Sequence, residues 1–264
     1  MDLNAICNEV CVIAKATGAF IRKEVDAIKE SDIETKGVHD FVTYVDKKAE
    51  ELIVDSLKIL VPDAGFIVEE KTISKKGEEY NWVVDPLDGT TNFIHGLPCF
   101  SVSIALMQND TVVVGVVYEI NQDECFSAVK GGGAFLNEKK IRVSKAAGIQ
   151  DSLLATGFPY YDYSRLDNYM ELFTWFLRNS HGVRRFGSAA VDLAYVACGR
   201  FEGYFEYSLN SWDVAAGSLL VEEAGGDVSD FNGGKDYLFG REIVAANKNI
   251  FPEFIERIKT AFTS

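Results

Sequence analysis

The sequence predicts an α+β protein in which helices are layered on two β-sheets, and three observations support this fold class. Apolar residues recur at helical spacing near the N-terminus, short strands fill the stretch from about residue 64 to 143, and helices alternate with strands after residue 150. Because only short loops join these elements, we expect residues 1–264 to form a single unit. Its two tightly packed lobes would cover approximately residues 1–145, with the antiparallel sheet, and 146–264.

Two amphipathic helices are predicted near the N-terminus, with a polar segment between them. Residues 31–44 lack any hydrophobic period and are rich in polar residues, so we expect them to form a mobile loop. The second helix should end at Pro62, with an inner face formed by Ala49, Leu52, Ile53, Leu57 and Leu60. The first helix has its apolar and small side chains at steps of three and four: Leu3, Ile6, Cys7, Val10, Ile13, Ala14, Thr17, Phe20 and Ile21.

The middle of the chain has the pattern of an antiparallel meander. Short apolar runs at 66–68 and 82–84 each end in an acidic residue, and residues 100–106 alternate with a period of two. Asn109-Asp110 is a turn signal before the β-branched run 111–119, and 123–129 and 140–143 continue the meander. Beyond it, helices are expected at about 165–178, 188–198, 213–224 and 249–262, and strands near 152–155, 202–207 and 243–246.

The composition limits the kinds of molecule that the chain is expected to bind. With 47% hydrophobic and 25% charged residues the chain can bury a sizeable core, which excludes an intrinsically disordered protein. The formal charge of −14 repels phosphate backbones and anionic lipid, so neither nucleic acid nor a membrane is an expected partner. Bound metal ions could still reverse the local field for a small phosphorylated molecule.

The cysteines and the N-terminus indicate a cytoplasmic location. The five cysteines are odd in number and contain no Cys-x-x-Cys pair, so we expect buried thiols in a reducing compartment. The N-terminus has no basic region followed by an apolar region, as a secretion signal would, and no apolar stretch is long enough to span a membrane.

The most specific local sequence is Asp85-Pro86-Leu87-Asp88-Gly89-Thr90-Thr91-Asn92-Phe93, which follows an apolar strand. Two carboxylates this close repel each other unless a cation lies between them, and carboxylate and carbonyl oxygens are the ligands that Mg²⁺ prefers. The alternative is an ordinary turn, because Asp, Pro and Gly are common turn residues.

Further acidic residues favour the metal site over the turn. Glu69-Glu70 ends the preceding predicted strand, where strand ends of α/β proteins often converge on one crevice. Asp213 precedes another predicted helix, where its alternative role is an N-cap. Together with Asp85 and Asp88 they supply the carboxylates that a two-metal phosphoryl-transfer site needs.

Several other chemistries lack their motifs. There is no Gly-rich loop ending in Gly-Lys-Ser/Thr and no Gly-x-Ser-x-Gly elbow, while Gly131-Gly132-Gly133 sits among strands as a turn. The three histidines, His39, His95 and His181, are scattered without zinc-ligand spacing. Metal-activated water is the mechanism that remains.

The chain resembles the inositol monophosphatase family of the lithium-sensitive, magnesium-dependent phosphatases, over nearly its whole length. The marks are the Asp85–Phe93 motif, Val68-Glu69-Glu70, and Trp212-Asp213-Val214-Ala215-Ala216-Gly217 followed by Glu222-Glu223-Ala224-Gly225-Gly226. The resemblance implies a five-layer α/β/α/β/α sandwich of the sugar-phosphatase type, with a large, mainly antiparallel sheet and a smaller mixed one. It also implies a homodimer, for which the strand-rich region 100–125 is a candidate interface.

The same resemblance implies the metal ligands. Glu69, Asp85 and the Leu87 carbonyl would hold a first Mg²⁺, and Asp85, Asp88 and Asp213 a second. Glu69 would also help to hold a third, weaker ion, so two to three Mg²⁺ are expected.

It implies the catalytic groups as well. Thr90, helped by Asp46, would orient and deprotonate the attacking water, which makes Asp46, Glu69 and Thr90 the expected catalytic residues. The Gly89 and Thr90 amides would hold the phosphate. From the sequence alone, Asp46 fits better as the N-cap of the helix that follows it.

The substrate contacts implied by the resemblance are Asp88, Gly89, Thr90, Ala189, Glu206 and Asp213. Glu206 matches a hydroxyl-binding acid and Ala189 a position beside the inositol ring, although a strand-end carboxylate and an ordinary helix residue are the alternatives. The pair Arg184-Arg185 is interpreted as solvated, with neutralisation of a second phosphate as the alternative.

Asp88-Gly89-Thr90-Thr91-Asn92-Phe93 favours an inositol phosphate over a nucleotide bisphosphate. The expected activity is Mg²⁺-dependent hydrolysis of myo-inositol 1-phosphate. Fructose 1,6-bisphosphate, histidinol phosphate and 3′-phosphoadenosine 5′-phosphate remain alternative substrates. A catalytically silent binding protein and an acidic scaffold remain alternative functions.

Overall fold

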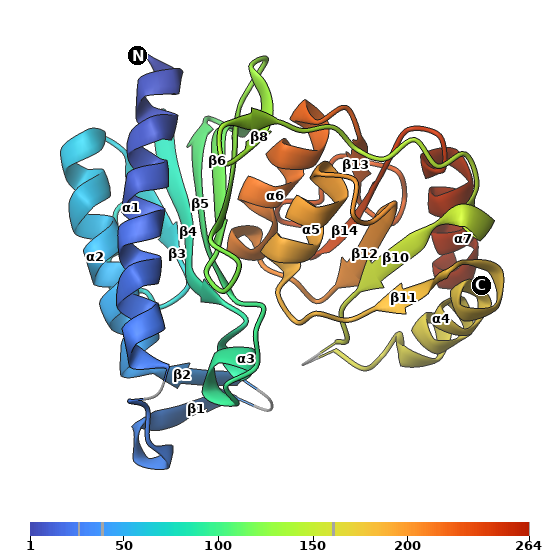
Figure 1. Cartoon of the computed structure of the whole chain (residues 1–264), viewed down its shortest axis with the longest axis horizontal. Helices are drawn as coiled ribbons and strands as arrows, with labels where there is room; N and C mark the ends of the chain where they lie inside the picture. The colour runs from blue at the N-terminus through green and yellow to red at the C-terminus, as the bar shows by residue number, and fades with distance from the viewer. Residues whose placement is uncertain (26, 38–39, 160–161, 264) are drawn as a thin grey trace.

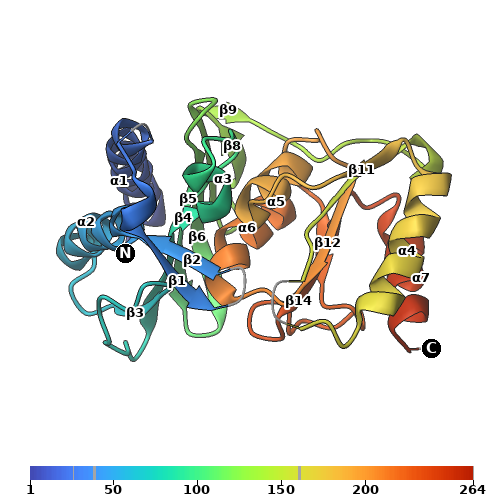
Figure 2. The same cartoon turned by 90° about the horizontal axis from the view of Figure 1, so that it is seen from below.

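The computed structural model describes residues 1–25, 27–37, 40–159 and 162–263 as five alternating layers (Figures 1 and 2). Helices α1 (Leu3–Glu24) and α2 (Tyr44–Leu60) cover the outer face of a seven-stranded sheet. Helices α5 (Ala189–Ala197) and α6 (Ser211–Glu223) lie between this sheet and a five-stranded one, whose outer face is covered by α4 (Leu166–Asn179) and α7 (Phe251–Thr263). This order confirms the predicted α/β/α/β/α sandwich.

The larger sheet has the strand order β3-β4-β5-β6-β7-β8-β9 and is antiparallel except for the parallel pair β3–β4. Helix α3 (Thr90–Ile94) follows β4 directly. The strands are β3 (Gly65–Val68), β4 (Tyr80–Asp88), β5 (Ser101–Gln108), β6 (Thr111–Glu119), β7 (Glu124–Val129), β8 (Gly133–Leu136) and β9 (Lys139–Lys140).

The smaller sheet is mixed, as predicted. Its order is β11-β10-β12-β14-β13, with parallel pairs on both sides of β10 and antiparallel pairs on both sides of β14. The strands are β10 (Leu153–Thr156), β11 (Gly182–Arg184), β12 (Gly203–Tyr207), β13 (Asp227–Ser229) and β14 (Glu242–Ala246).

The inner face of α2 differs from the prediction at one apolar position. Ala49, Ile53 and Leu57 are fully buried, whereas Leu52 is 40% exposed and Glu50 is 0% exposed. The helical period places position 50 on the same face as 53 and 57, so the apolar character of Leu52 was misleading. The burial of Glu50 has a consequence for the active site, described below.

The polar segment between the two helices is a hairpin rather than the predicted loop. Strands β1 (Ile33–Gly37) and β2 (Asp40–Thr43) pair antiparallel, with Ile33 opposite Thr43. The prediction failed because strand pairing is made by backbone hydrogen bonds, which the local hydrophobic pattern does not report. Residues 38 and 39, including His39, lie outside the described residues.

Strand β4 runs through the Asp85–Asp88 motif and contains a bulge there. Asp85 lies opposite Ser103 and Asp88 opposite Ser101, so two residues of β4 face one residue of β5 in between. In a regular strand, residues three apart point to opposite faces of the sheet. The extra residue of the bulge therefore brings both carboxylates to the same face.

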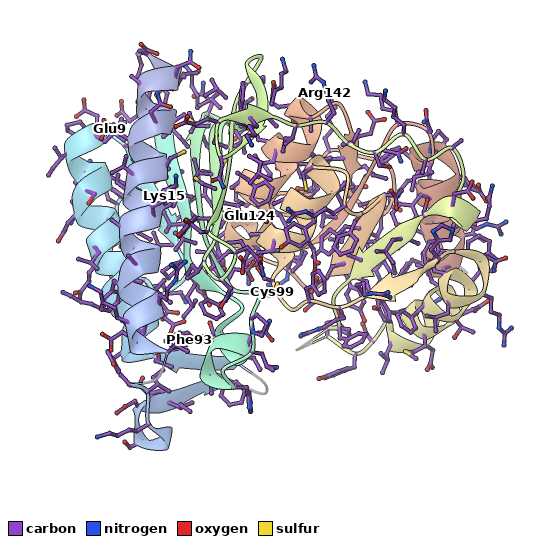
Figure 3. All side chains as sticks on the ribbon, in the orientation of Figure 1. Glu9, Lys15, Phe93, Cys99, Glu124 and Arg142 are labelled. Atoms are coloured by element: carbon purple, nitrogen blue, oxygen red, sulfur yellow. The ribbon has the colours of Figure 1, made fainter. Side chains whose placement is uncertain are left out.

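Two predictions about buried residues need correction. Cys7 and Cys125 are buried, but Cys11, Cys99 and Cys198 are only partly buried; Cys99 is labelled among the side chains of Figure 3. The side chains of β5 and β6 are almost all buried within the chain itself, so most of the region 100–125 is core rather than contact surface.

In the part of the chain that the structure describes, no helix is both long and apolar enough to cross a membrane.

Candidate active site

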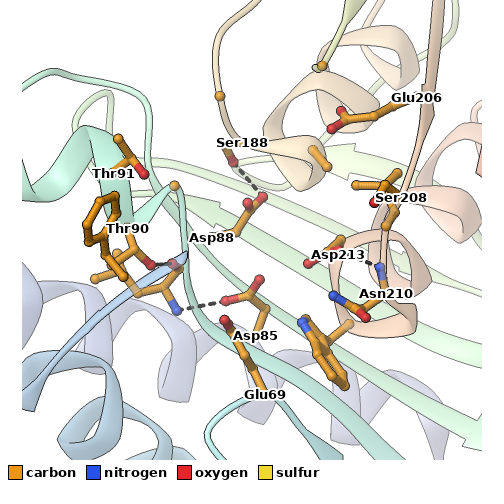
Figure 4. Close-up of a pocket in the computed structure, with 18 of the residues that line it drawn as sticks. Glu69, Asp85, Asp88, Thr90, Thr91, Ser188, Glu206, Ser208, Asn210 and Asp213 are labelled. Carbon is orange, nitrogen blue, oxygen red and sulfur yellow. Dashed lines mark hydrogen bonds between the residues drawn. The ribbon is translucent and has the colours of Figure 1, made fainter. Parts of the chain in front are cut away.

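A cavity of about 130 Å³ at the ends of β3 and β4 gathers the acidic residues of the three sequence motifs (Figure 4). The starts of α5 and α6 and the end of β12 form its other walls. Nine of the ten predicted site residues line it: Glu69, Asp85, Leu87, Asp88, Gly89, Thr90, Ala189, Glu206 and Asp213. The tenth, Asp46, is buried behind the wall and reaches it through Thr90.

Asp85 and Asp88 are held by backbone and hydroxyl donors. The Leu87 amide donates to Asp85 Oδ1 at 3.0 Å. Asp88 Oδ2 accepts from the Ser188 hydroxyl at 2.6 Å and from the Ala190 amide at 2.8 Å, both at the start of α5. The middle helix layer thus fixes the Asp88 carboxylate, which comes from the strand of another layer.

Asp213 is fixed by a capping box at the start of α6. The helix N-cap is Asn210, and the Asp213 carboxylate accepts from the Asn210 amide at 2.6 Å. The interpretation of Asp213 as an N-cap is therefore wrong by three positions, because Asp213 is the N3 residue of the box. Asp213 also shares a side-chain hydrogen bond with Asp85 and feels the charges of Asp88 and Arg241.

Burial and mutual repulsion raise the pKa values of these acids. Burial raises the pKa of Asp85 well above its ordinary value, and the charges of Glu69, Asp88 and Asp213 raise it further. The pKa of Asp88 rises to about 6 and that of Asp213 to about 7, in both cases mainly through burial. For Asp213 the neighbouring Asp88 adds to the effect. Carboxylates held this close without a counter-charge are costly to ionise.

The donors fit hard divalent cations. Carboxylates and the Leu87 carbonyl offer only oxygen, which suits Mg²⁺. In the described part of the chain, no three His, Cys, Asp or Glu side chains form a closed ligand set around one point. The carboxylates share a cavity and repel one another, so the site has the donors and the excess negative charge that a cation would neutralise.

Asp46, which is buried, and Thr90, which is half-buried, form a hydrogen-bonded pair. The Thr90 hydroxyl is 3.0 Å from Asp46 Oδ1 and 3.0 Å from the Leu87 carbonyl oxygen, and its single proton can be donated to only one of them. Asp46 Oδ2 accepts from the Thr43 amide at 2.9 Å and its hydroxyl at 2.6 Å. Thr43 is the N-cap of α2 and Asp46 is N3 of the capping box, so the predicted N-cap role of Asp46 is also wrong.

Glu206 lines the same cavity as the four acids. The Tyr204 hydroxyl donates to its Oε2, and burial raises its pKa to about 8. A Cβ on Gly157 would lie 2.0 Å from the Glu206 carboxyl atoms, so the absence of a side chain at residue 157 leaves room for this carboxylate. Ala189 is the first residue of α5 and contributes its methyl group to the same cavity.

Glu50 holds the segment that carries Glu69. Its carboxylate is fully buried and accepts from the Glu70 amide at 2.7 Å, the Thr72 amide at 2.8 Å and the Thr72 hydroxyl at 2.7 Å. The sequence pattern gave no indication of this role, because a Glu on an amphipathic helix is normally assigned to the exposed face.

Two other residues of the site were missed or misjudged. Ser188 follows a glycine and precedes a predicted helix, so its role as an N-cap could be predicted. Its hydrogen bond to Asp88 could not, because the two residues are 100 positions apart in the sequence. Arg185 was interpreted as part of a solvated pair, yet it is half-buried, lines the cavity and lowers the pKa values of Asp88 and Glu206. Arg184 is exposed.

Comparison with known proteins agrees with the motifs and the fold. A model of the inositol monophosphatase family matches residues 2–261. An inositol-1-monophosphatase of Mesorhizobium japonicum is 38% identical over 260 residues, 98% of each chain. A Nus factor SuhB of Escherichia coli K12 is 42% identical over 247 residues, 93% of this chain and 92% of the relative.

Among solved structures, the extragenic suppressor protein suhB from Bartonella henselae superposes with a TM-score of 0.91 at 40% identity, covering 97% of this chain and 98% of that one. The match therefore extends over nearly the whole chain. The chain belongs to the inositol monophosphatase family.

Proposed function

We propose that the protein is a Mg²⁺-dependent phosphomonoesterase that hydrolyses myo-inositol 1-phosphate to inositol and phosphate. The observation that supports this most strongly is that Glu69, Asp85, Asp88 and Asp213 line one cavity together with Thr90. Membership of the inositol monophosphatase family supports the same reaction class.

The proposed ligands of a first Mg²⁺ are Glu69, Asp85 and the Leu87 carbonyl, and those of a second are Asp85, Asp88 and Asp213; Glu69 would also contribute to a third ion. Bound Mg²⁺ would supply an activated water and charge neutralisation at the phosphate and the leaving alcohol. Because the side chains do not form a closed ligand set on their own, we expect carboxylate rotation on binding.

Thr90 and Asp46 would control the proton of the attacking water. Thr90 has two acceptors at equal distance, the Leu87 carbonyl and Asp46. If the Leu87 carbonyl is engaged elsewhere, the Thr90 proton is directed to Asp46, and the Thr90 oxygen can accept a proton from water. Asp46 is held on its other oxygen by Thr43, so this relay has a fixed orientation.

Substrate recognition would use the part of the cavity wall that Glu206 and Ala189 form. Glu206 is placed to accept hydrogen bonds from ring hydroxyls, and Ala189 to contact the ring itself. Asp88 and Asp213 would contact the substrate as well as metal, and the Gly89 and Thr90 amides lie beside the proposed phosphate position. The run Thr91-Asn92-Phe93 at the end of the Asp85–Phe93 motif supports an inositol phosphate over the alternative substrates.

A catalytically silent binding protein is the second candidate, because a relative named Nus factor SuhB is as similar as the one named inositol-1-monophosphatase. Every carboxylate of the site and Thr90 are present, which favours catalysis. Phosphate release from myo-inositol 1-phosphate, measured with Mg²⁺ and with EDTA, separates the two. Release that requires Mg²⁺ supports the enzyme; no release at any Mg²⁺ concentration, with binding retained, supports the silent protein.

We further propose a cytoplasmic homodimer that is inhibited by Li⁺. Light scattering coupled to size exclusion tests the dimer, which should elute at twice the chain mass of 29.2 kDa. Millimolar Li⁺ should slow phosphate release, and an unchanged rate would remove the Li⁺ proposal without affecting the reaction.

A further inference from the structure

A second and larger cavity adjoins the active site. Its volume is about 890 Å³, against about 130 Å³ for the first, and the two share Glu69, Ser208, Asn210 and Trp212 in their walls. Ligand-binding pockets generally measure roughly 300–1,000 Å³, so of these two adjoining cavities only the second reaches this range alone. We call this second cavity the annex.

The lining of the annex is mixed in charge rather than cationic. The Arg165 guanidinium pairs with Glu242 at 2.6 Å, so a carboxylate of the chain already offsets part of its positive charge. Lys71 and Arg241 are balanced by Glu70 and Asp162 on the same walls. A second phosphate would meet carboxylates as well as cations here, so the annex does not suit a bisphosphate.

Donors and acceptors of this mixture suit hydroxyl groups. A hydroxyl both donates and accepts, and it can bond to carboxylate, guanidinium and amide in turn. The annex presents all three, as Asp162, Arg241 and Asn210, beside two aromatic rings, Tyr207 and Trp212. Aromatic rings offer apolar area next to polar contacts, which matches the C–H faces and hydroxyl edges of a sugar ring.

One group in the annex wall lacks a hydrogen bond. The Tyr207 hydroxyl is buried without a partner among the described residues, and the residue as a whole is only 3% exposed. Buried hydroxyls are normally paired, so this one needs a partner that the chain does not supply. This hydroxyl is covered in the chain on its own, so a ligand hydroxyl in the annex would satisfy it only after a neighbouring side chain moves.

The backbone around the annex is also strained. Lys71, Ser208 and Arg241 have φ angles of 57°, 72° and 65°, in the left-handed region that residues with a Cβ rarely adopt. All three line the annex. Strained conformations of this kind are concentrated at ligand-binding sites.

We propose that the annex binds a second sugar or polyol ring of the leaving alcohol, so that the enzyme accepts phosphorylated glycosides and hydrolyses them more efficiently than single-ring phosphates. This inference rests on the proposed phosphomonoesterase function. Arg241 and the Tyr207 hydroxyl would be the specificity-determining groups, while the reacting phosphate stays in the first cavity.

The test compares matched substrates on the full chain with Mg²⁺. Trehalose 6-phosphate and glucose 6-phosphate share the same phosphate ester and differ only in a second neutral ring. We expect kcat/KM to be about tenfold higher for trehalose 6-phosphate, as one to two new hydrogen bonds would give. In Tyr207→Phe and Arg241→Gln this ratio should fall towards one, whereas Arg178→Gln, on the exposed face of α4, should retain it.

If phosphomonoesters are hydrolysed, three results would overturn the proposal for the annex. One is an equal kcat/KM for the two sugar phosphates while myo-inositol 1-phosphate is still hydrolysed, which leaves the proposed function intact. Another is a ratio that survives both annex variants. The third is a preference for fructose 1,6-bisphosphate over fructose 6-phosphate without one for trehalose 6-phosphate, since a distal anion would then be recognised. If no phosphomonoester is hydrolysed, the proposed function fails, and the two sugar phosphates are compared by calorimetric binding, where equal affinities overturn the annex.

Discussion

Asp88 and Asp213 are carboxylates that the fold holds close together, so that their negative charges repel each other. Each is anchored by donors at the start of a helix, Asp88 by Ser188 and Ala190 and Asp213 by Asn210. These bonds favour the charged form but do not offset burial, since both pKa values remain raised. Anchored, repelling carboxylates are a charge arrangement that a divalent cation stabilises.

Replacing either acid by its amide should therefore affect activity and stability in opposite directions. Asp88→Asn or Asp213→Asn should lower kcat by several powers of ten, each worth about 1.4 kcal/mol of barrier. The same variants should raise the free energy of unfolding of the metal-free protein by on the order of 1 kcal/mol, because one repelling charge is removed. Phosphate release and urea unfolding in EDTA measure the two effects. Normal turnover of either variant at low Mg²⁺ would contradict the proposed metal ligands.

Gly157 is a position where a single methyl group should change substrate binding. In Gly157→Ala the new Cβ would meet the Glu206 carboxyl at 2.0 Å and displace it from the wall. We expect KM for myo-inositol 1-phosphate to rise about tenfold or more with a smaller change in kcat, as in Glu206→Gln. An unchanged KM in Gly157→Ala, with KM raised in Glu206→Gln, would contradict the predicted displacement of the Glu206 carboxyl by a side chain at residue 157.

Local sequence signals identified which residues lie in the site, but they did not identify the structural role of each residue. The acidic motifs indicated Glu69, Asp85, Asp88 and Asp213, and all four lie in one cavity. The N-cap interpretation of Asp46 and Asp213 failed in the same way, because Ser, Thr, Asn and Asp at N-cap and acids at N3 belong to one capping box. The bond from Ser188 to Asp88 joins segments 100 residues apart, and no local pattern reports such a contact.

The bulge in β4 and the Glu50 clamp are the features of the elements that position the acids. The bulge turns Asp85 and Asp88 to one face, and Glu50 of α2 holds the segment 69–72 by three hydrogen bonds. Neither was predicted, because a bulge depends on register with the neighbouring strand and the clamp depends on the packing of α2 against that segment. The hairpin β1–β2 was missed for a related reason, since its pairing is made by the backbone.

Glu50→Gln should loosen the segment that carries Glu69. The amide NH₂ of Gln would face a backbone N–H on one side, so a buried donor loses its acceptor, at a cost of about 1–3 kcal/mol of unfolding free energy. The Mg²⁺ concentration for half-maximal phosphate release should rise as well. Glu51→Gln on the exposed face of the same helix is the matched control and should change neither quantity. A Glu50→Gln protein as stable as the control would contradict the clamp.

The cavity is lined by residues from three of the five layers, so the site exists only in the assembled sandwich. The layer order followed from the sequence because helical and strand periods are local and helices must cover both sheets. The convergence of residues 46 to 213 on one cavity did not follow from those periods, and only the motifs pointed to it. The division into lobes at about residue 145 stays a prediction.

The raised pKa values predict how stability depends on pH. Folded Asp88, Asp213 and Glu206 have pKa values of about 6, 7 and 8, whereas unfolded carboxyls ionise near 4. Between these limits the folded chain holds more protons than the unfolded one, so the free energy of unfolding falls as pH rises from 4 to 8. In EDTA the Tm should therefore fall from pH 5 to 8, and less so in Asp213→Asn.

Mg²⁺ should reverse this trend, because it binds the ionised carboxylates. The increase in Tm caused by Mg²⁺ should be larger at pH 8 than at pH 5, with KCl of equal ionic strength as the control. An equal increase at both pH values would mean that the stabilising cation binds away from these acids.

Calorimetric titration of Mg²⁺ into the whole chain at pH 7.5 tests the central claim most directly, that four carboxylates from three distant segments form one cation site. We expect saturable binding of two to three ions by the unaltered protein, and a loss of at least tenfold in affinity for the tightest site in Asp85→Asn. The exposed Asp55→Asn is the control and should bind like the unaltered chain. Equal Mg²⁺ affinity in Asp85→Asn and Asp55→Asn, or no binding by the unaltered chain, would contradict the claim.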